Sequence, residues 1–252
     1  MDLSTSAGLP AKVTLELAAA AGLTVSAAAA LAAALDLSAP FILFTALLGL
    51  GLGGVVGLFW KRASPDKRPV DVSSLGPANR ITLARGALIC TVAGFIPFAE
   101  YAQAHAWIVA FITLAALILD GVDGAAARRT QSQSAFGARF DMELDALLIL
   151  ILCGLLITLE KAGAWVLLIG LMRYAFVIAG WFYPVLNQPL PESFRRKTVC
   201  VWQLVTLVIC LLPPVPSGLA MAFLALSLAL LVYSFGKDIG WLLRSPEAKK
   251  PI

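Results

Sequence analysis

The sequence predicts an all-α, polytopic integral membrane protein with a six-helix core and an additional N-terminal helical pair. Of its 252 residues, 60% are hydrophobic and 13% are charged, whereas a soluble domain is usually about half apolar and about a quarter charged. The apolar residues form eight stretches that are long enough, or nearly so, to cross a hydrocarbon core of about 30 Å as helices. The stretches are residues 13–36, 40–60, 79–99, 104–128, 138–160, 163–185, 197–213 and 217–243.

Residues 1–60 contain the first two stretches and are predicted to form the N-terminal transmembrane or interfacial pair. The first stretch is rich in alanine, and it also fits a cleaved secretory signal or a helix that lies in the membrane interface. Residues 61–78 are polar, basic and interrupted by proline, so they are predicted to be a juxtamembrane linker. This linker either lies along the anionic inner leaflet or simply connects the two parts. Residues 79–243 form the predicted six-helix transmembrane domain, and residues 244–252 a cytoplasmic tail.

The positions of lysine and arginine predict which helix ends face the cytoplasm. Sixteen of the 19 basic residues lie on one alternating set of ends, and the opposite ends hold only Lys161. Arg173 and Lys237 fall inside predicted helices. Because positive residues are enriched in cytoplasmic loops, both termini are predicted to face the cytoplasm from the cell inner membrane. The sixteen are Lys12, Lys61, Arg62, Lys67, Arg68, Arg80, Arg85, Arg128, Arg129, Arg139, Arg195, Arg196, Lys197, Arg244, Lys249 and Lys250.

Composition argues against two other classes of protein. The net charge of +4 and the pI near 9.0 would suit a nucleic-acid binder, but the basic residues flank apolar stretches, so no nucleic-acid partner is expected. The four cysteines are scattered singly through apolar segments without a CxxC pair. They therefore predict neither a zinc site nor a disulfide framework.

Five of the 15 acidic residues lie close together in the sequence, around the end of one predicted helix and the start of the next. Asp120 and Asp123 are three residues apart, and Asp141 and Asp145 are four apart, so each pair shares one face of its helix. Glu143 is two residues from each neighbour and is expected to point away. Because the intervening loop is short, the two helices are predicted to be antiparallel neighbours whose acidic faces meet.

Four carboxylates at a membrane boundary need compensation, since burying one such charge costs several kcal/mol. A site that is rich in carboxylates and lacks cysteine and histidine suits Mg²⁺, Mn²⁺ or Ca²⁺ rather than zinc. The lone histidine, His105, lies at the opposite end of the preceding helix and is interpreted as an interfacial residue. Gly124 and Gly137 flank the acids, and small residues allow a flat ligand to approach the backbone closely.

These residues resemble the signature of the CDP-alcohol phosphotransferase family. The pattern Asp120-x2-Asp123-Gly124-x2-Ala127-Arg128-x8-Gly137-x3-Asp141-x3-Asp145 matches that signature at all eight defined positions. The six stretches from residue 79 to residue 243 are similar to the six-helix core of the family. The resemblance thus covers about two thirds of the chain and leaves residues 1–60 outside it.

The resemblance implies a transferase that uses CDP-diacylglycerol and two Mg²⁺ or Mn²⁺ ions in phospholipid synthesis. It implies that Asp120 and Asp141 bridge the two ions, that Asp123 and Asp145 each complete one site, and that Asp141 and Asp145 are catalytic. Asp145 would be the base that takes the proton from the acceptor hydroxyl. The family also implies a homodimer.

The same resemblance implies contacts to the CDP portion of the donor. Gly124, Arg128, Ser134 and Gly137 would lie along it. The segment from Pro77 to Thr82 resembles the start of the first core helix of the family, where Asn79 and Thr82 would touch the nucleotide. Ala78 between Pro77 and Asn79 departs from the commonest form of that segment.

The acceptor alcohol is predicted only by class. Arg173 within an apolar helix, together with Arg195, Arg196 and Lys197, favours an acceptor that bears phosphate, such as glycerol 3-phosphate or inositol phosphate. The same cations would equally suit the phosphates of the donor. The basic cluster at residues 195–197 is also explained by membrane topology alone, because basic residues are enriched in cytoplasmic loops. An amino-alcohol acceptor such as choline, ethanolamine or serine is an alternative. A divalent-cation transporter is a second class, because intramembrane carboxylates also mark ion pathways.

Overall fold

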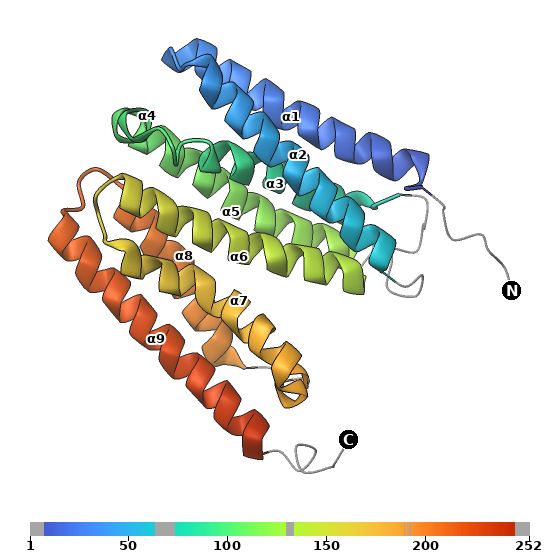
Figure 1. Ribbon diagram of the computed structural model, residues 1–252, viewed down its shortest axis with the longest axis vertical. Coiled ribbons are helices and arrows are strands. Elements are labelled where there is room, and N and C mark those ends of the chain that lie inside the picture. The colour runs from blue at the N-terminus through green and yellow to red at the C-terminus, as the bar shows by residue number, and fades with distance from the viewer. Residues whose placement is uncertain (1–7, 64–73, 130–133, 189, 192, 245–252) are drawn as a thin grey trace, which may run out of the picture. The chain divides into compact units, whose positions relative to one another are not determined.

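The computed structural model describes residues 8–63, 74–129, 134–188, 190–191 and 193–244, without the side chains of residues 123–129. All regular elements in these ranges are helical (Figure 1), which confirms the predicted fold class. Most of the predicted linker 61–78 and of the tail 244–252 lies outside the described residues. The elements are α1 (Ala11–Leu35), α2 (Ala39–Arg62), α3 (Pro77–Ala93), α4 (Ala99–Ala104), α5 (Ala106–Arg129), α6 (Ala135–Thr158), η2 (Ala164–Val166), α7 (Leu167–Phe182), η3 (Pro184–Asn187), α8 (Phe194–Leu211) and α9 (Ser217–Arg244).

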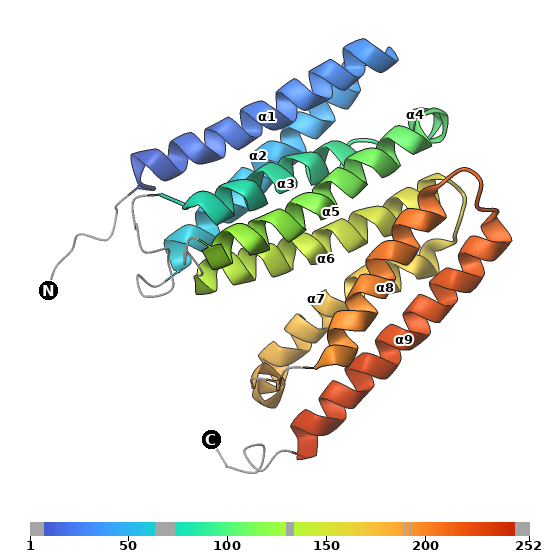
Figure 2. The ribbon, with the colours of Figure 1, turned by 180° about the vertical axis from the view of Figure 1, so that it is seen from behind.

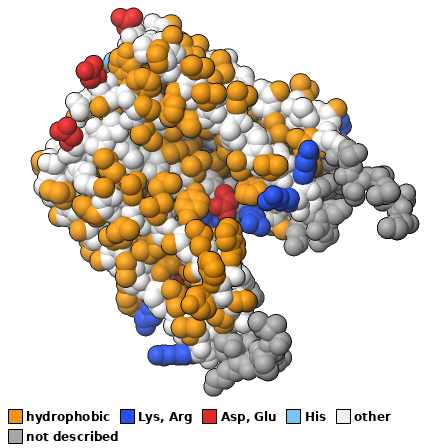
Figure 3. Space-filling view, in the orientation of Figure 1, with side chains coloured by type: hydrophobic (Ala, Val, Ile, Leu, Met, Phe, Trp, Pro, Cys, Tyr) orange, Lys and Arg blue, Asp and Glu red, His pale blue; other side chains and the backbone are white. Residues whose placement is uncertain are grey.

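The surface of these helices is that of a multi-pass membrane protein. Four described segments are long and apolar enough to cross a membrane, namely α1, α2, Ala164–Phe182 and α9. Hydrophobic side chains are spread over the face drawn in Figure 3, with few charged ones among them. Leu43 of α2 and Phe111 of α5, for example, are more than 60% exposed. A water-soluble protein rarely exposes so continuous an apolar surface, so these side chains face lipid.

The chain divides into two compact units, Met1–Asp145 and Ala146–Ile252. In the first unit, α1 and α2 form a helical hairpin, and α1 ends where Asp36 takes the left-handed conformation with φ 55°. The hairpin packs on α3, which in turn packs on α5 (Figures 1 and 2). Small residues allow this close packing: a Cβ at Gly86 of α3 would lie 2.6 Å from Leu52 of α2.

Helix α3 is shorter than predicted, because it ends at Ala93 rather than at residue 99. Gly94 caps the helix by donating its amide hydrogen to the Cys90 carbonyl, 3.0 Å away. A side chain at this position would collide with Thr45 Oγ1 of α2. Pro97 follows and has no amide hydrogen with which to continue a helix. The chain therefore turns here, through the short α4, before α5 begins.

The second unit contains the later part of α6 and the helices α7, α8 and α9, of which α9 packs on α7 and α8. Gly170 of α7 lies against α6 so closely that a Cβ there would be 2.7 Å from Leu150 Cα. The ammonium group of Lys161, which follows α6, donates to the carbonyl oxygens of Leu212, Pro213 and Val215 after α8. Lys161 thus caps a helix end, which explains a lone cation on that side of the protein.

Candidate functional site

The acidic residues converge on a buried arginine in the first unit. Helix α5 carries Asp120, α6 carries Asp141 and Asp145, and one carboxylate oxygen of each lies within 4.8 Å of the others. Arg85 of α3 lies among them. Its Nη2 is 2.7 Å from Asp141 Oδ1 and 3.1 Å from Asp145 Oδ1, and its Nη1 pairs with Asp120 Oδ1. The prediction that the acid-bearing helix faces meet is therefore confirmed for these three aspartates.

Local sequence sets the start of α6 and so the register of its two aspartates. Ser134 precedes the helix, and its Oγ accepts a hydrogen bond of 3.0 Å from the amide of Gly137. This is the bond of an N-cap serine to the third helical residue, which satisfies an amide hydrogen that has no partner within the helix. Starting there, the helix places Asp141 and Asp145 one turn apart on the same face.

The arginine of the cluster is buried, whereas its aspartates are partly exposed. The side chain of Arg85 is 1% exposed, whereas those of Asp120, Asp141 and Asp145 are 37%, 40% and 29% exposed. Arg85 thus forms the floor of the cluster, and the carboxylates extend outward from it. Three carboxylates and one guanidinium leave a formal charge of −2, so a ligand that approaches from the exposed side meets negative charge.

The carboxylate cluster fits a hard divalent cation. Mg²⁺ and Mn²⁺ prefer oxygen ligands, and the charge of −2 on the cluster would balance one such ion. Asp141 Oδ1 is buried, and no described donor is oriented to hydrogen-bond to it, although Arg85 Nη2 lies 2.7 Å away. The ion pair with Arg85 offsets part of the cost of burying this oxygen, and a metal ion would offset more.

Several predicted site residues fall where only the backbone is described. Asp123, Gly124 and Arg128 belong to the last turns of α5, and their side chains lie outside the described residues. Glu143 lies on α6 between two members of the cluster and does not belong to it.

A second group of predicted residues meets beside the acids, where α3 and α6 begin. Asn79 is 5% exposed, and its Nδ2 donates to the Leu75 carbonyl at 2.7 Å. A Cβ at Gly137 would lie 2.6 Å from Asn79 Oδ1 and 3.2 Å from Ser134 Oγ. Asn79, Ser134 and Gly137 are therefore brought together. Thr82 lies one turn further along α3, is 3% exposed and donates to the Ala78 carbonyl at 3.1 Å.

The predicted acceptor residues all belong to the second unit. Arg195 of α8 pairs with Asp238 of α9 at 2.5 Å and donates to Ser234 Oγ at 2.7 Å. Arg196 Nη1 lies 3.6 Å from the same Asp238 oxygen. Lys197 is exposed at the start of α8, and Arg173 is half-buried on α7. Two of the four predicted cations thus share one carboxylate that the sequence analysis had not identified as their partner.

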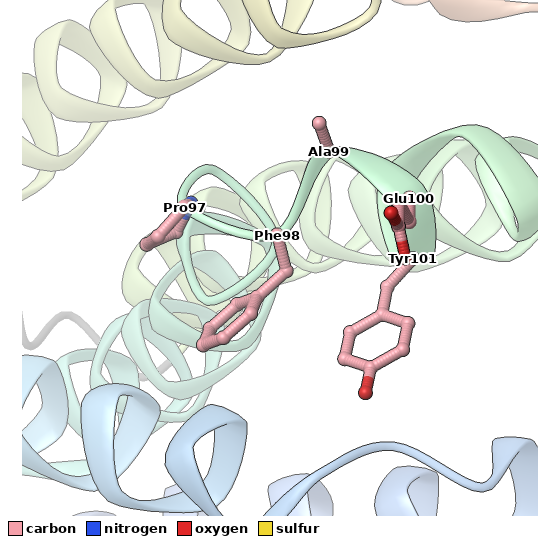
Figure 4. A pocket seen from close by; sticks show the side chains of 5 residues that line it. All are labelled: Pro97, Phe98, Ala99, Glu100 and Tyr101. Atoms are coloured by element: carbon pink, nitrogen blue, oxygen red, sulfur yellow. The ribbon is translucent and has the colours of Figure 1, made fainter.

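A hollow near α4 contains none of the predicted site residues. It has a volume of about 350 Å³ and is lined by residues 97–101 (Figure 4). The phenol oxygen of Tyr101 in this hollow accepts a hydrogen bond of 3.2 Å from the Ser38 amide between α1 and α2. Residues 97–101 precede α5, whereas Asp120 lies about 20 Å further along that helix. We interpret the hollow as part of the contact that holds the α1–α2 turn.

Arg85 and Asp238 are two residues of these clusters that the sequence did not predict. Arg85 was expected to flank the membrane, but it lies in the middle of α3, on the face that carries Asn79 and Thr82. The spacing of three residues from 79 to 82 to 85 was the available signal. For Asp238 the signal was an acid within the last predicted apolar stretch, residues 217–243.

Comparison with known proteins agrees with the arrangement of the first unit. A family model described as CDP-alcohol phosphatidyltransferase matches residues 75–233, which is more than half of the chain. The match begins four residues before Asn79 and contains the entire carboxylate cluster. Residues 1–74, which include α1 and α2, lie outside it. No curated protein and no solved structure matches the chain significantly.

Proposed function

Since this chain belongs to the CDP-alcohol phosphatidyltransferase family, a family of transferases in phospholipid synthesis, we propose that it transfers the phosphatidyl group of CDP-diacylglycerol to a small polar alcohol. The other product is CMP. The observation that carries the proposal is the convergence of Asp120, Asp141 and Asp145 within 4.8 Å at the exposed side of a buried arginine. Such a cluster offers oxygen ligands to metal ions that in turn hold a pyrophosphate.

The proposal includes two Mg²⁺ or Mn²⁺ ions. Asp120, Asp123, Asp141 and Asp145 would hold them. The metals would supply positive charge that neutralises the donor pyrophosphate and stabilises the leaving phosphate. The formal charge of −2 on the described cluster and the buried Asp141 Oδ1 support this assignment.

Asp145 is the proposed base. Its carboxylate would take the proton of the acceptor hydroxyl, and the acceptor oxygen would then form a bond to the phosphorus that bears diacylglycerol. The bond from that phosphorus to the oxygen of the CMP phosphate breaks, and CMP leaves with the electron pair. At 29% exposure Asp145 is the least exposed of the three aspartates, yet it remains open enough for a hydroxyl to approach.

The CDP portion would lie along the starts of α3 and α6. Asn79, Thr82, Ser134 and Gly137 are the described residues of this subsite, and Gly124 and Arg128 at the end of α5 would complete it. The support is that Asn79 Oδ1 and Ser134 Oγ meet at Gly137, which gathers hydrogen-bonding groups from the starts of two helices in one place.

An acceptor with a phosphate group fits the second unit better than an amino alcohol. Arg195 and Arg196 share Asp238, so these three described side chains together keep a formal charge of +1. A quaternary amine would need an aromatic cage. The aromatic residues at the end of α7, Trp181 and Phe182, are at least 75% exposed and are typical of a membrane-interface belt instead. Glycerol 3-phosphate and inositol phosphate are therefore the first acceptors to test.

We also propose that the protein is a homodimer in the cell inner membrane, with the catalytic cluster and both termini on the cytoplasmic side. The distribution of basic residues around the helices supports the orientation. Cytoplasmic access would allow CMP to return directly to the soluble nucleotide pool.

Product analysis tests the proposal. The full chain, purified in detergent, is incubated with labelled CDP-diacylglycerol, either Mg²⁺ or Mn²⁺, and one acceptor at a time. We expect CMP release that requires both the metal and one acceptor, with equal amounts of CMP and new phospholipid. Absence of CMP release with every phosphate-bearing and amino-alcohol acceptor would contradict the proposed activity. Metal flux into vesicles without any CMP would favour a cation transporter.

A further inference from the structure

A carboxylate of the N-terminal hairpin holds the start of α3. Glu16 of α1 accepts a hydrogen bond of 2.8 Å from the Leu75 amide through its Oε2. Its Oε1 accepts from Arg80 Nε at 2.8 Å and from Arg80 Nη2 at 2.6 Å. The Glu16 side chain is 12% exposed, and that of Arg80 is 57% exposed. Both oxygens of a nearly buried acid are thus used to fix one short segment of chain.

That segment orients a residue of the donor subsite. The amide of Leu75 donates to Glu16, while the carbonyl of the same residue accepts from Asn79 Nδ2 at 2.7 Å. Asn79 Oδ1 then lies against Gly137 of α6. A continuous series of polar contacts therefore leads from the N-terminal hairpin to the side chain that is expected to touch the nucleotide.

The hairpin also contacts the first turns of α6. Trp60 of α2 is 1% exposed and packs edge-on against Phe136, with ring centroids 5.2 Å apart. Arg139 lies over the ring of Phe59, 5.6 Å from its centroid. Phe136 immediately precedes Gly137, so α1 supports one side of the donor subsite and α2 supports the other.

We propose that the N-terminal hairpin is a positioning element for the CDP donor and that Glu16 is its principal positioning residue. Glu16 acts through Leu75 and Asn79 and touches neither substrate nor metal. The inference rests on the proposed function for the identity of the donor. It assigns a role to residues outside 75–233, the part of the chain that matches the family.

The Glu16→Ala variant of the full chain tests the inference through steady-state kinetics. Removing one partner of a nearly buried, hydrogen-bonded charge pair is costly, and here it releases the segment that orients Asn79. We expect the KM for CDP-diacylglycerol to rise on the order of tenfold, while kcat and the KM for the acceptor change less than about twofold. Calorimetric titration with CMP should show the same loss of affinity, which provides a readout that does not depend on turnover.

Further variants separate positioning from simple destabilisation. Arg80→Ala should raise the donor KM in the same direction, and the double variant should be no worse than the poorer single variant, because both changes break one shared interaction. Glu16→Gln keeps the shape and one acceptor oxygen, so its effect should be smaller than that of Glu16→Ala. The matched control is Glu100→Ala, which removes an exposed carboxylate of α4 in the same unit and should leave both KM values unchanged.

The results distinguish this inference from the proposed function. If the wild-type chain releases no CMP, the proposed function fails. If the wild type is active but Glu16→Ala only lowers Tm, with the donor KM and CMP affinity unchanged, Glu16 is merely structural and the inference is wrong. A fall in kcat alone, or equal rises in both KM values, would also overturn it. Should Glu16→Ala fail to fold, the comparison of Glu16→Gln and Arg80→Ala with the wild type decides by the same criteria.

Discussion

The two units of the protein each hold an arginine within apolar helices, but they compensate it in opposite ways. In the first unit, Arg85 is surrounded by three aspartates that leave the cluster with excess negative charge on its exposed side. In the second unit, Arg195 pairs with Asp238, which it shares with Arg196, and it also donates to Ser234 Oγ. That cluster keeps excess positive charge.

The difference indicates what each cluster can bind. Negative charge that is only partly compensated attracts metal cations, and positive charge that is only partly compensated attracts phosphate. The proposed transfer to an acceptor that bears phosphate would use both properties. The following variants test whether the two clusters differ in this way.

The largest effect is expected for Asp145→Asn. This change keeps the size of the side chain and removes the proposed base, so transfer should fall by about a thousandfold, while binding of the CDP donor largely survives. The measurement is CMP release together with CMP affinity. Glu143→Gln, two residues away on the same helix, is the control and should retain activity. An Asp145→Asn enzyme with most of its turnover would remove Asp145 from the mechanism.

Next in size is Arg85→Ala, which would leave three carboxylates without their buried cation. We expect a loss of stability of about 3 kcal/mol, measured by thermal or chemical unfolding in detergent. Because the acids then lack compensation, Mn²⁺ should raise the Tm of this variant more than that of the wild type.

The exposed Arg139 provides the control for Arg85. Among the described residues its contact is with the Phe59 ring, so Arg139→Ala should cost about 1 kcal/mol or less. Equal stability losses for the two arginines would mean that Arg85 does not compensate the acids.

A smaller effect, confined to the donor, is expected for Gly137→Ala. The new Cβ would lie 2.6 Å from Asn79 Oδ1, so Asn79 must move and the donor KM should rise about tenfold. Gly121→Ala makes the same substitution on α5, where a Cβ has open space, and should have no effect on KM. An unchanged donor KM in Gly137→Ala would show that close approach at this glycine is not needed.

The smallest effect is expected in the second unit. If its positive charge binds the acceptor phosphate, Arg195→Ala should raise the acceptor KM about fivefold without changing the donor KM. Asp238→Asn should act in the opposite direction and lower the acceptor KM by about twofold, because it removes the acid that Arg195 and Arg196 share. Lys237→Ala, next to Asp238 but directed toward Tyr233, is the control. Parallel losses in stability without any change in acceptor KM would make the cluster structural.

Much of the fold and part of the site could be predicted from the sequence, because both depend on local patterns. Long apolar stretches identify the helices, and the spacing of Asp120, Asp141 and Asp145 places their carboxylates on defined helix faces. The early end of α3 was harder to predict from the sequence. It lies at Gly94, which packs against Thr45 of α2, a residue almost fifty positions earlier in the chain.

Partners that come from other helices could not be predicted in this way. Arg85, Glu16 and Asp238 each act on residues more than 30 positions away in the sequence. Hydropathy describes each of them only as a charge within or beside a membrane helix. The packing of α1, α5 and α9 against their neighbours is what gives each charge its partner.

Lys161 has a consequence for the connection between α8 and α9. The carbonyl oxygens that follow α8 lie in a turn with three prolines, Pro213, Pro214 and Pro216, and a proline has no amide hydrogen to donate to them. The ammonium group of Lys161 has three hydrogens and reaches the carbonyls of Leu212, Pro213 and Val215. One side chain from the end of α6 thus supplies donors that the turn itself lacks. It therefore fastens the α8–α9 connection to a helix about fifty residues earlier in the chain.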